Sequence, residues 1–208
     1  NTTKNGRVNT MEYLQALHNR RTIYSITDET TIPDEQVTDI VQQALRDCPT
    51  HNNSQSSCAV VLLGKHHKKL WDIVMETLRK QVPPEKFGCT EKKIDSFAAG
   101  HGTILYFDDT AITQDYVKNV PLYKDNFPLW AQQQNGMLQF AIWTALEENG
   151  LGASLQHYNP LIDDEVRREW NLPESWQLIA QMPFGKPYAP PQEKEWKPME
   201  QRLRLFLD

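Results

Sequence analysis

Hydrophobic residues are most concentrated in the stretch 128–159, where their pattern predicts a long helix and then a short strand. Between Gly136 and Leu146, apolar residues lie on almost every side of the predicted helix, so no broad solvent-facing side remains. Such a helix has to be covered by its own domain or by a second copy of the chain. Gly150 favours a left-handed helix end, and the small and polar residues 151–159 predict a short strand leading into a loop with free backbone donors.

Shorter patterns on either side of this helix predict the other elements. Amphipathic spacing predicts helices over 11–19, 33–48, 66–81, 111–117 and 161–170. Apolar runs of strand length predict strands over 58–63, 103–107 and 176–182, and the prolines of 183–187 are expected to end the third of them. Alternation of apolar and polar residues predicts a further strand over 199–207. The charged stretch 85–99 has only a weak helical pattern and is expected at the surface, as are the adjacent His66 and His67.

Length and composition describe an ordinary globular protein: 208 residues suffice for one domain that buries roughly 70% of its unfolded surface. The net charge of −5 argues against a nucleic-acid-binding protein. Three cysteines without C-x-x-C spacing are typical of a reducing compartment and exclude a small zinc motif. The chain shows no secretory signal, so a cytoplasmic location is predicted. Residues 1–10 are interpreted as a leader or an added extension, which leaves 11–208 as the expected domain.

The usual short signatures of dinucleotide, nucleotide, zinc-protease and serine-hydrolase sites do not occur, so a site has to be assembled from separated polar pieces. Adjacent Arg20 and Arg21, followed by Thr22, could bind a phosphate through guanidinium forks, or could be solvated surface charges. Asn53 and Gln55 in the polar run 49–57 could hydrogen-bond the edge of a planar heterocycle, or could form an Asx-rich turn. Basic residues near the C-terminus form the third piece, and they are Lys186, Lys194 and Lys197.

Taken together and in this order, the pieces resemble the nitroreductase family of flavin-dependent oxidoreductases. The matching motifs are Arg-Arg-[Ser/Thr] at 20–22, Pro-x-x-x-Asn-x-Gln at 49–55, the long helix leading into Gly-x-Gly-Ala-Ser at 150–154, and Pro-x-Gly-x-Pro at 183–187. The resemblance spans 11–206, and the segments 20–24, 100–105 and 155–163 resemble the compact branch found in fungi and lactic-acid bacteria. The chain departs from the family pattern at Ser56, where proline is usual, and at 194–197, where Lys-Glu-Trp-Lys replaces a late arginine motif.

The resemblance implies an α+β sandwich with a mostly antiparallel central sheet flanked by helices, assembled as an intertwined homodimer. It implies FMN bound at the dimer interface, NADH or NADPH as reductant, and ping-pong reduction of nitroaromatics or quinones. Because the flavin carries the chemistry, no catalytic side chain, metal, membrane or nucleic acid is expected.

The resemblance also implies roles for individual residues. Residues expected to hold the phosphate and ribityl end of the flavin are Arg20, Arg21, Thr22 and Tyr24, with Lys194 or Lys197 completing the phosphate site. In the polar loop, Asn53 and Ser54, or their neighbours Thr50 and His51, are expected to approach the flavin from the other subunit. Gln55 of the same loop is also expected to bind the cofactor. Residues expected to lie along the isoalloxazine, with a backbone donor near its reactive nitrogen, are Leu155, Gln156 and His157.

Two other classes of function stay open at this point. A flavin-binding sensor, regulator or store on the same scaffold would use the same binding residues, so these residues predict flavin binding more directly than turnover. A helical interaction protein without a cofactor is the third alternative, because each motif taken alone has an ordinary structural explanation. The physiological electron acceptor and the preference between NADH and NADPH are not specified by these motifs.

Overall fold

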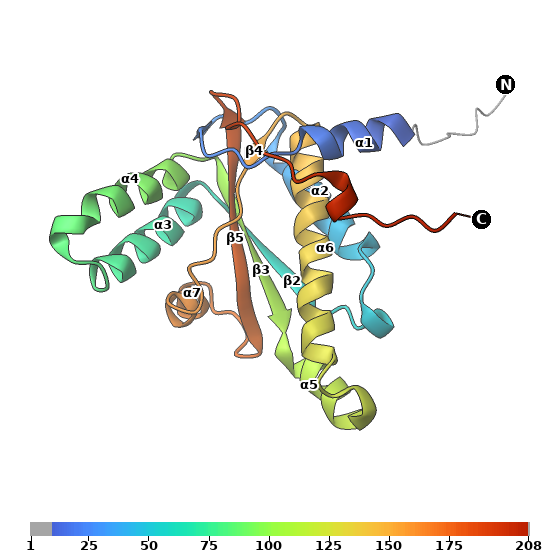
Figure 1. Cartoon of the computed structure of the whole chain (residues 1–208). Coiled ribbons are helices and arrows are strands. Elements are labelled where there is room, and N and C mark those ends of the chain that lie inside the picture. The colour runs from blue at the N-terminus through green and yellow to red at the C-terminus, as the bar shows by residue number, and fades with distance from the viewer. Residues whose placement is uncertain (1–9, 208) are drawn as a thin grey trace, which may run out of the picture.

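The computed structural model describes residues 10–207 as helices packed on both faces of one sheet (Figure 1). The α-helices are α1 (Thr10–Asn19), α2 (Asp34–Asp47), α3 (Gly64–Arg79), α4 (Phe87–Ala98), α5 (Thr110–Asn119), α6 (Phe127–Glu148) and α7 (Asp163–Glu169). The strands are β1 (Ile26–Thr27), β2 (Ser57–Leu63), β3 (Gly102–Asp109), β4 (Gly152–Ala153) and β5 (Trp176–Pro187). Short 3-10 helices are η1 (His51–Asn53), η2 (Pro84–Lys86), η3 (Pro121–Tyr123) and η4 (Met199–Gln201). Apart from Thr10, the predicted leader lies outside the described residues.

The strands run in the order β1-β5-β3-β2, with β4 also paired with β5, and every named pair is antiparallel. Side chains of β3 alternate between two cores because successive residues of a strand point to opposite faces. Ile104 and Tyr106 pack toward α2 and α6, whereas Leu105 and Phe107 pack toward α3, α4 and α7. The predicted α+β class with a mostly antiparallel sheet flanked by helices is confirmed.

Helix α6 is incompletely covered by its own chain. Leu138, Ile142 and Leu146 are almost fully buried against the sheet and α2. On the opposite side, Leu129 is 53% exposed and Met137 is 45% exposed. The apolar residues that the sequence places around this helix are therefore only partly buried within one chain. A second copy of the chain is the expected way to bury the others.

The prediction that the prolines of 183–187 end the strand is wrong, because β5 continues to Pro187. A residue in a strand directs its nitrogen and its carbonyl to the same edge. The Pro183 carbonyl accepts a hydrogen bond from the Ser154 amide at 3.3 Å, so the missing proline N–H also faces that edge. Pairing with β3 on the other edge continues past Pro183, which lies opposite Thr103.

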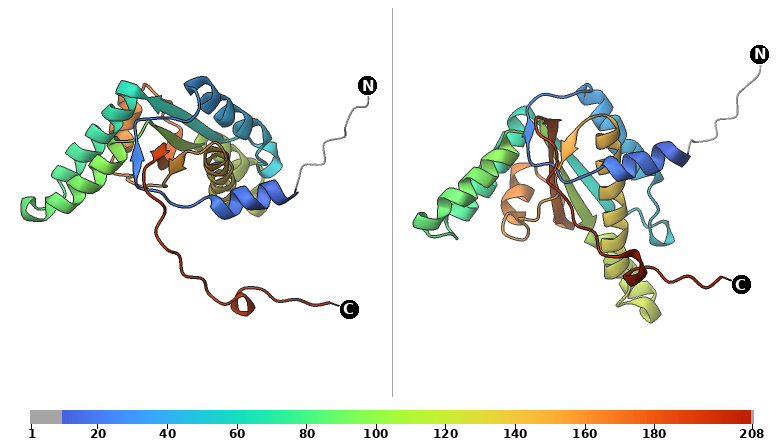
Figure 2. Two further views of the ribbon diagram at one scale, coloured as in Figure 1. Left: turned by 90° about the horizontal axis from the view of Figure 1, so that it is seen from above. Right: turned by 45° about the horizontal axis from the view of Figure 1, so that its top comes forward.

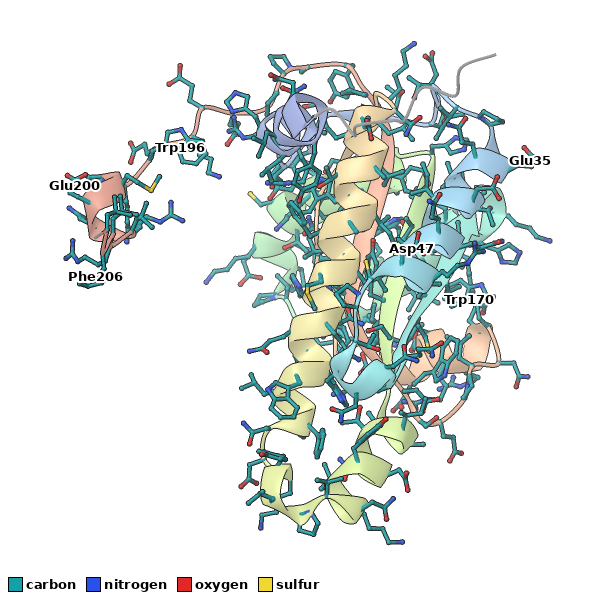
Figure 3. The ribbon with its side chains drawn as sticks, turned by 90° about the vertical axis from the view of Figure 1, so that its right-hand side faces the viewer. Glu35, Asp47, Trp170, Trp196, Glu200 and Phe206 are labelled. Atoms are coloured by element: carbon teal, nitrogen blue, oxygen red, sulfur yellow. The ribbon has the colours of Figure 1, made fainter. Side chains whose placement is uncertain are left out.

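The predicted strand at 199–207 is also wrong. The segment forms η4 and then an unpaired chain that extends away from the body of the molecule, as Figure 2 shows. Figure 3 places Trp196, Glu200 and Phe206 together on this projecting segment. A strand needs a neighbour that supplies its hydrogen bonds, and the described residues place none beside 199–207.

The predicted surface positions of 85–99 and of His67 need correction. Ile94 and Phe97 of helix α4 are completely buried. One side of this helix therefore packs against the core, although its hydrophobic pattern is weak. His67 is only 1% exposed and belongs to a chain of hydrogen bonds. Trp71 Nε1 donates to Thr103 Oγ1 at 3.0 Å, the Thr103 hydroxyl can then donate to His67 Nδ1 at 2.9 Å, and His67 Nε2 donates to the Ala98 carbonyl at 3.1 Å.

This chain of hydrogen bonds predicts that the protein loses stability in mild acid. Burial lowers the pKa of His67 from 6.5 to about 4, so the unfolded chain binds the proton first as the pH falls. The stabilising contribution is complete above the unfolded-state pKa, and it is lost as the pH falls toward the folded-state value. Lowering the pH from about 7 to about 5 should reduce the free energy of unfolding through this group by about 2 kcal/mol. Urea unfolding of the parent and of His67→Gln measures it, and an equal pH dependence in both would contradict it.

Candidate functional site

A cleft of about 310 Å³ lies beside the end of α1, and it contains most of the residues predicted to bind a phosphate. Its lining residues are Arg20, Arg21, Thr22, Tyr24, Gln192, Glu193 and Lys194. Lys194 is thus the late basic residue that the structure places with the arginines, and Lys197 is exposed and does not line this cleft. The cleft is lined by two segments, 20–24 and 192–194, which lie near opposite ends of the sequence.

The segment 20–24 is placed by the short strand β4. The Ile23 amide donates to the Ala153 carbonyl at 3.0 Å, and Thr22 forms a parallel bridge with Ala153. Gly152 allows this close approach, because a Cβ atom there would lie 2.9 Å from Ile23 Cγ2. The Gly-x-Gly-Ala-Ser stretch therefore positions the paired arginines as well as its own backbone.

The Arg20 guanidinium is held against the aromatic side of α6. Its central carbon lies 4.5 Å from the ring centroid of Trp143 and 5.7 Å from that of Phe140. Its Nε atom is buried and has no hydrogen-bond partner within residues 10–207. Burial, followed by the neighbouring charge of Arg21, lowers the pKa of Arg20, and Glu147 acts in the opposite direction.

This arrangement suits an anionic ligand. Arg20 carries a buried donor without an acceptor, and Arg21 donates to the Gln192 carbonyl, which ties the last segment of the chain to the cleft. Three cationic side chains and the Thr22 hydroxyl line one small space together with a single carboxylate, that of Glu193, and such a donor set suits a phosphate group. The residues present therefore fit the phosphate end of a flavin mononucleotide.

The polar loop 49–57 lies elsewhere on α6. The His51 amide donates to Gln134 Oε1 at 2.9 Å, and the His51 ring packs against Tyr116, Phe127 and Trp130. Both ring nitrogens are buried and without a partner in the described part of the chain, and burial lowers the pKa of His51. A second cleft, of about 440 Å³, is lined by Pro49, Thr50, His51, Asn52, Trp130, Gln133, Gln134 and Met137.

The third predicted segment, 155–157, runs antiparallel to the middle of β5. Gln156 and Gln181 exchange backbone hydrogen bonds at 2.7 and 2.9 Å, and Gln156 Nε2 donates to Ser154 Oγ at 3.1 Å. The Gln156 side chain is therefore held inside the protein. Because the amides of neighbouring residues in an extended chain point to opposite edges, those of Leu155 and His157 point away from β5.

A single chain brings the first group of predicted residues together and keeps the loop apart from it. Arg20 meets α6 at Trp143, whereas the loop meets it at Gln134. These positions are separated by roughly 13 Å along the helix at 1.5 Å per residue. Among the residues that line the two clefts, none belongs to both.

Sequence reasoning missed the contacts that α6 makes with both groups. Gln134 is 2% exposed and hydrogen-bonded to the loop. The Trp143 ring packs beside the Arg20 guanidinium. Gln134 lies in the polar run 132–135, and the sequence does not set it apart from its neighbours. Nothing in the sequence paired Trp143 with Arg20.

Among residues 10–207, no group of three or more His, Cys, Asp or Glu side chains is placed to hold a metal ion. Over the same range, helices that combine the length and the apolar character needed to span a bilayer are absent.

Comparison with known proteins places these features among relatives. The Nitroreductase family model matches residues 17–186. The putative nitroreductase HBN1 of Saccharomyces cerevisiae is 36% identical over 188 residues, covering 88% of this chain and 92% of the relative. The nitroreductase FRM2 of the same yeast is 35% identical over 192 residues, covering 89% and 93%. The nitroreductase CinD from Lactococcus lactis, solved with chloramphenicol, has a TM-score of 0.86 and 41% identity and covers 94% of this chain and 100% of its own.

Proposed function

Because the chain belongs to the nitroreductase family of oxidoreductases, we propose that it is an FMN-dependent NAD(P)H oxidoreductase that reduces nitroaromatics, quinones or both. The observation that carries the proposal is the cleft in which Arg20, Arg21 and Lys194 face one space. The substrate class is supported by CinD, which has been solved with the nitroaromatic compounds chloramphenicol and 4-nitrophenol.

In this proposal the chain binds and orients the flavin. Arg20 and Arg21 would hold the phosphate with Lys194, and Thr22 would hydrogen-bond a neighbouring phosphate or ribityl oxygen. The amides of Leu155 and His157 point away from β5 and are available as donors to the ring. Bound FMN would supply the redox chemistry, taking electrons from NAD(P)H and passing them to the acceptor in two successive half-reactions.

The complete site would be made by two copies of the chain. One side of α6 leaves Leu129 and Met137 exposed, so a second copy can bury an apolar surface that one chain leaves open. The loop 49–57 is remote from the arginine cleft of its own chain and would approach the flavin held by the other copy. An intertwined homodimer is the assembly that satisfies both observations.

Turnover can be separated from simple flavin binding by anaerobic mixing of the FMN-loaded protein with NADPH or NADH. The flavin absorption band should bleach at least as fast as the enzyme turns over, and it should return when menadione or a nitroaromatic is added. A band that bleaches slowly or not at all would support the flavin sensor or store. A colourless preparation that cannot be reconstituted with FMN would support a protein without a cofactor.

A further inference from the structure

The loop 49–57 has a conformation that its residues do not favour. The backbone φ angle is 51° at Asn52, 53° at Asn53 and 54° at Gln55. These angles lie in the left-handed region, which residues other than glycine rarely adopt. Asparagine tolerates this region better than glutamine does. Three such residues within four positions persist only where surrounding contacts hold them.

Gln134 of α6 supplies such contacts. The side chain is almost completely buried, and its Oε1 atom accepts hydrogen bonds from the His51 amide at 2.9 Å and from the Ser54 hydroxyl at 3.5 Å. Its Nε2 atom donates to Ser56 Oγ at 2.8 Å. One side chain therefore contacts the loop before, between and after its strained residues.

A buried carboxylate fixes the direction of these hydrogen bonds. Ser56 Oγ donates to Asp108 Oδ1 at 2.6 Å, and Thr113 Oγ1 donates to Asp108 Oδ2 at 2.9 Å. Ser56 is 0% exposed and Asp108 3%, and no salt bridge reaches Asp108 from the described part of the chain. Because the Ser56 hydroxyl donates its proton to Asp108, its oxygen can only accept a hydrogen bond from the Gln134 amide group. The amide group of Gln134 is thereby oriented with its oxygen toward His51.

We propose that Gln134 is a positioning residue for the flavin ring, which holds the strained loop 50–55 in the shape that meets the flavin of the partner copy. Ser56 is the connection between Gln134 and Asp108, and the serine hydroxyl is the feature that a proline at this position would lack. The inference rests on the proposed function, because the loop has a ring to meet only if the chain binds flavin.

The test compares two glutamines of α6. Gln134→Met keeps the side-chain length but removes the acceptor for His51, and Gln139→Met is the matched control. Gln139 is 8% exposed and bonds only within the helix, to Asn135 Oδ1 at 2.7 Å. Gln134→Met should raise the dissociation constants of FMN and riboflavin by the same factor, about tenfold, because the loop serves the ring and not the phosphate. Gln139→Met should leave both within about twofold of the parent.

Hydrogen exchange of the loop gives a readout that does not require flavin. In the apo protein, the peptide covering 49–56 should exchange faster in Gln134→Met than in the parent, and at the parental rate in Gln139→Met. If Gln134→Met does not fold, Gln134→Asn replaces it, because the shorter amide cannot reach the His51 amide and the site stays polar. The same two results are expected of that variant.

The outcomes separate this inference from the proposed function. If the parent binds FMN and the two methionine variants bind flavins equally, the positioning role is wrong and the proposed function stands. If Gln134→Met weakens FMN but not riboflavin, the loop does not serve the ring and the inference is again wrong. A parent protein that binds neither flavin overturns both proposals.

Discussion

Replacing Arg20 by alanine should weaken FMN binding by roughly 30- to several-thousand-fold and leave riboflavin binding nearly unchanged. A phosphate that moves from water into a partly dry cleft needs charge-assisted donors, and a guanidinium offers two in a fixed fork. Arg20 is already oriented by Trp143, so little ordering is required when the phosphate arrives. Removal of a buried charged partner typically costs about 2–5 kcal/mol, which gives the range stated above.

Fluorescence titration of the apo protein with FMN and with riboflavin measures this effect. Arg20→Lys should fall between the parent and Arg20→Ala, because an ammonium group keeps the charge and loses the fork. Arg46→Ala, which removes an exposed arginine of α2, is the control and should bind FMN as the parent does. Unchanged FMN affinity in Arg20→Ala, or an equal loss for riboflavin, would show that the phosphate lies elsewhere.

Deleting Pro198 to Asp208 should convert the proposed dimer largely to monomer at micromolar concentration and should weaken FMN binding at the same time. In a single chain this segment exposes apolar side chains that have nothing to pack against, among them Leu205 at 67% and Phe206 at 93%. Burial of apolar surface at about 25 cal/mol per Å² makes such side chains a substantial part of a subunit interface. Arg21 also bonds the carbonyl of Gln192, so the chain just before this segment borders the arginine cleft in which the phosphate is proposed to bind.

Size-exclusion chromatography and FMN titration of the truncated chain measure the two effects together. Glu200→Gln, an exposed polar change within the same segment, should leave both properties unchanged. A truncated chain that elutes as a dimer and binds FMN normally would show that the segment 198–208 has no part in the assembly. Loss of dimer without loss of FMN would show that the flavin is held by one chain alone.

The elements that could be predicted from sequence are those long enough to show a period. The continuous apolar run of β3 and the spacing in α2, α3 and α6 predicted their elements to within a few residues. Strands β1 and β4 have two residues each, which is too short for any period to appear. The end of β5 was misplaced because the edge to which Pro183 points depends on the neighbouring segment 152–156, which sequence order does not reveal.

The candidate site divides in the same way. Arg20, Arg21 and Thr22 were found because adjacent residues of one type form a visible motif, and the structure places them with Lys194. Gln134 and Trp143 were missed because their partners, His51 and Arg20, lie 83 and 123 positions away in the chain and meet them only through packing on α6. The predicted strand at 199–207 failed for a related reason, because alternation describes a strand only where a neighbouring strand exists.

The claim that FMN lies between two copies of the chain is tested most directly by sedimentation velocity of the FMN-loaded protein. The boundary would be followed at the flavin absorption band and at the protein band. The account predicts that both signals sediment as one species of twice the chain mass, with one flavin for each chain. Flavin that sediments with a stable, folded single chain at micromolar concentration would contradict it, as would a dimer that carries no flavin after reconstitution.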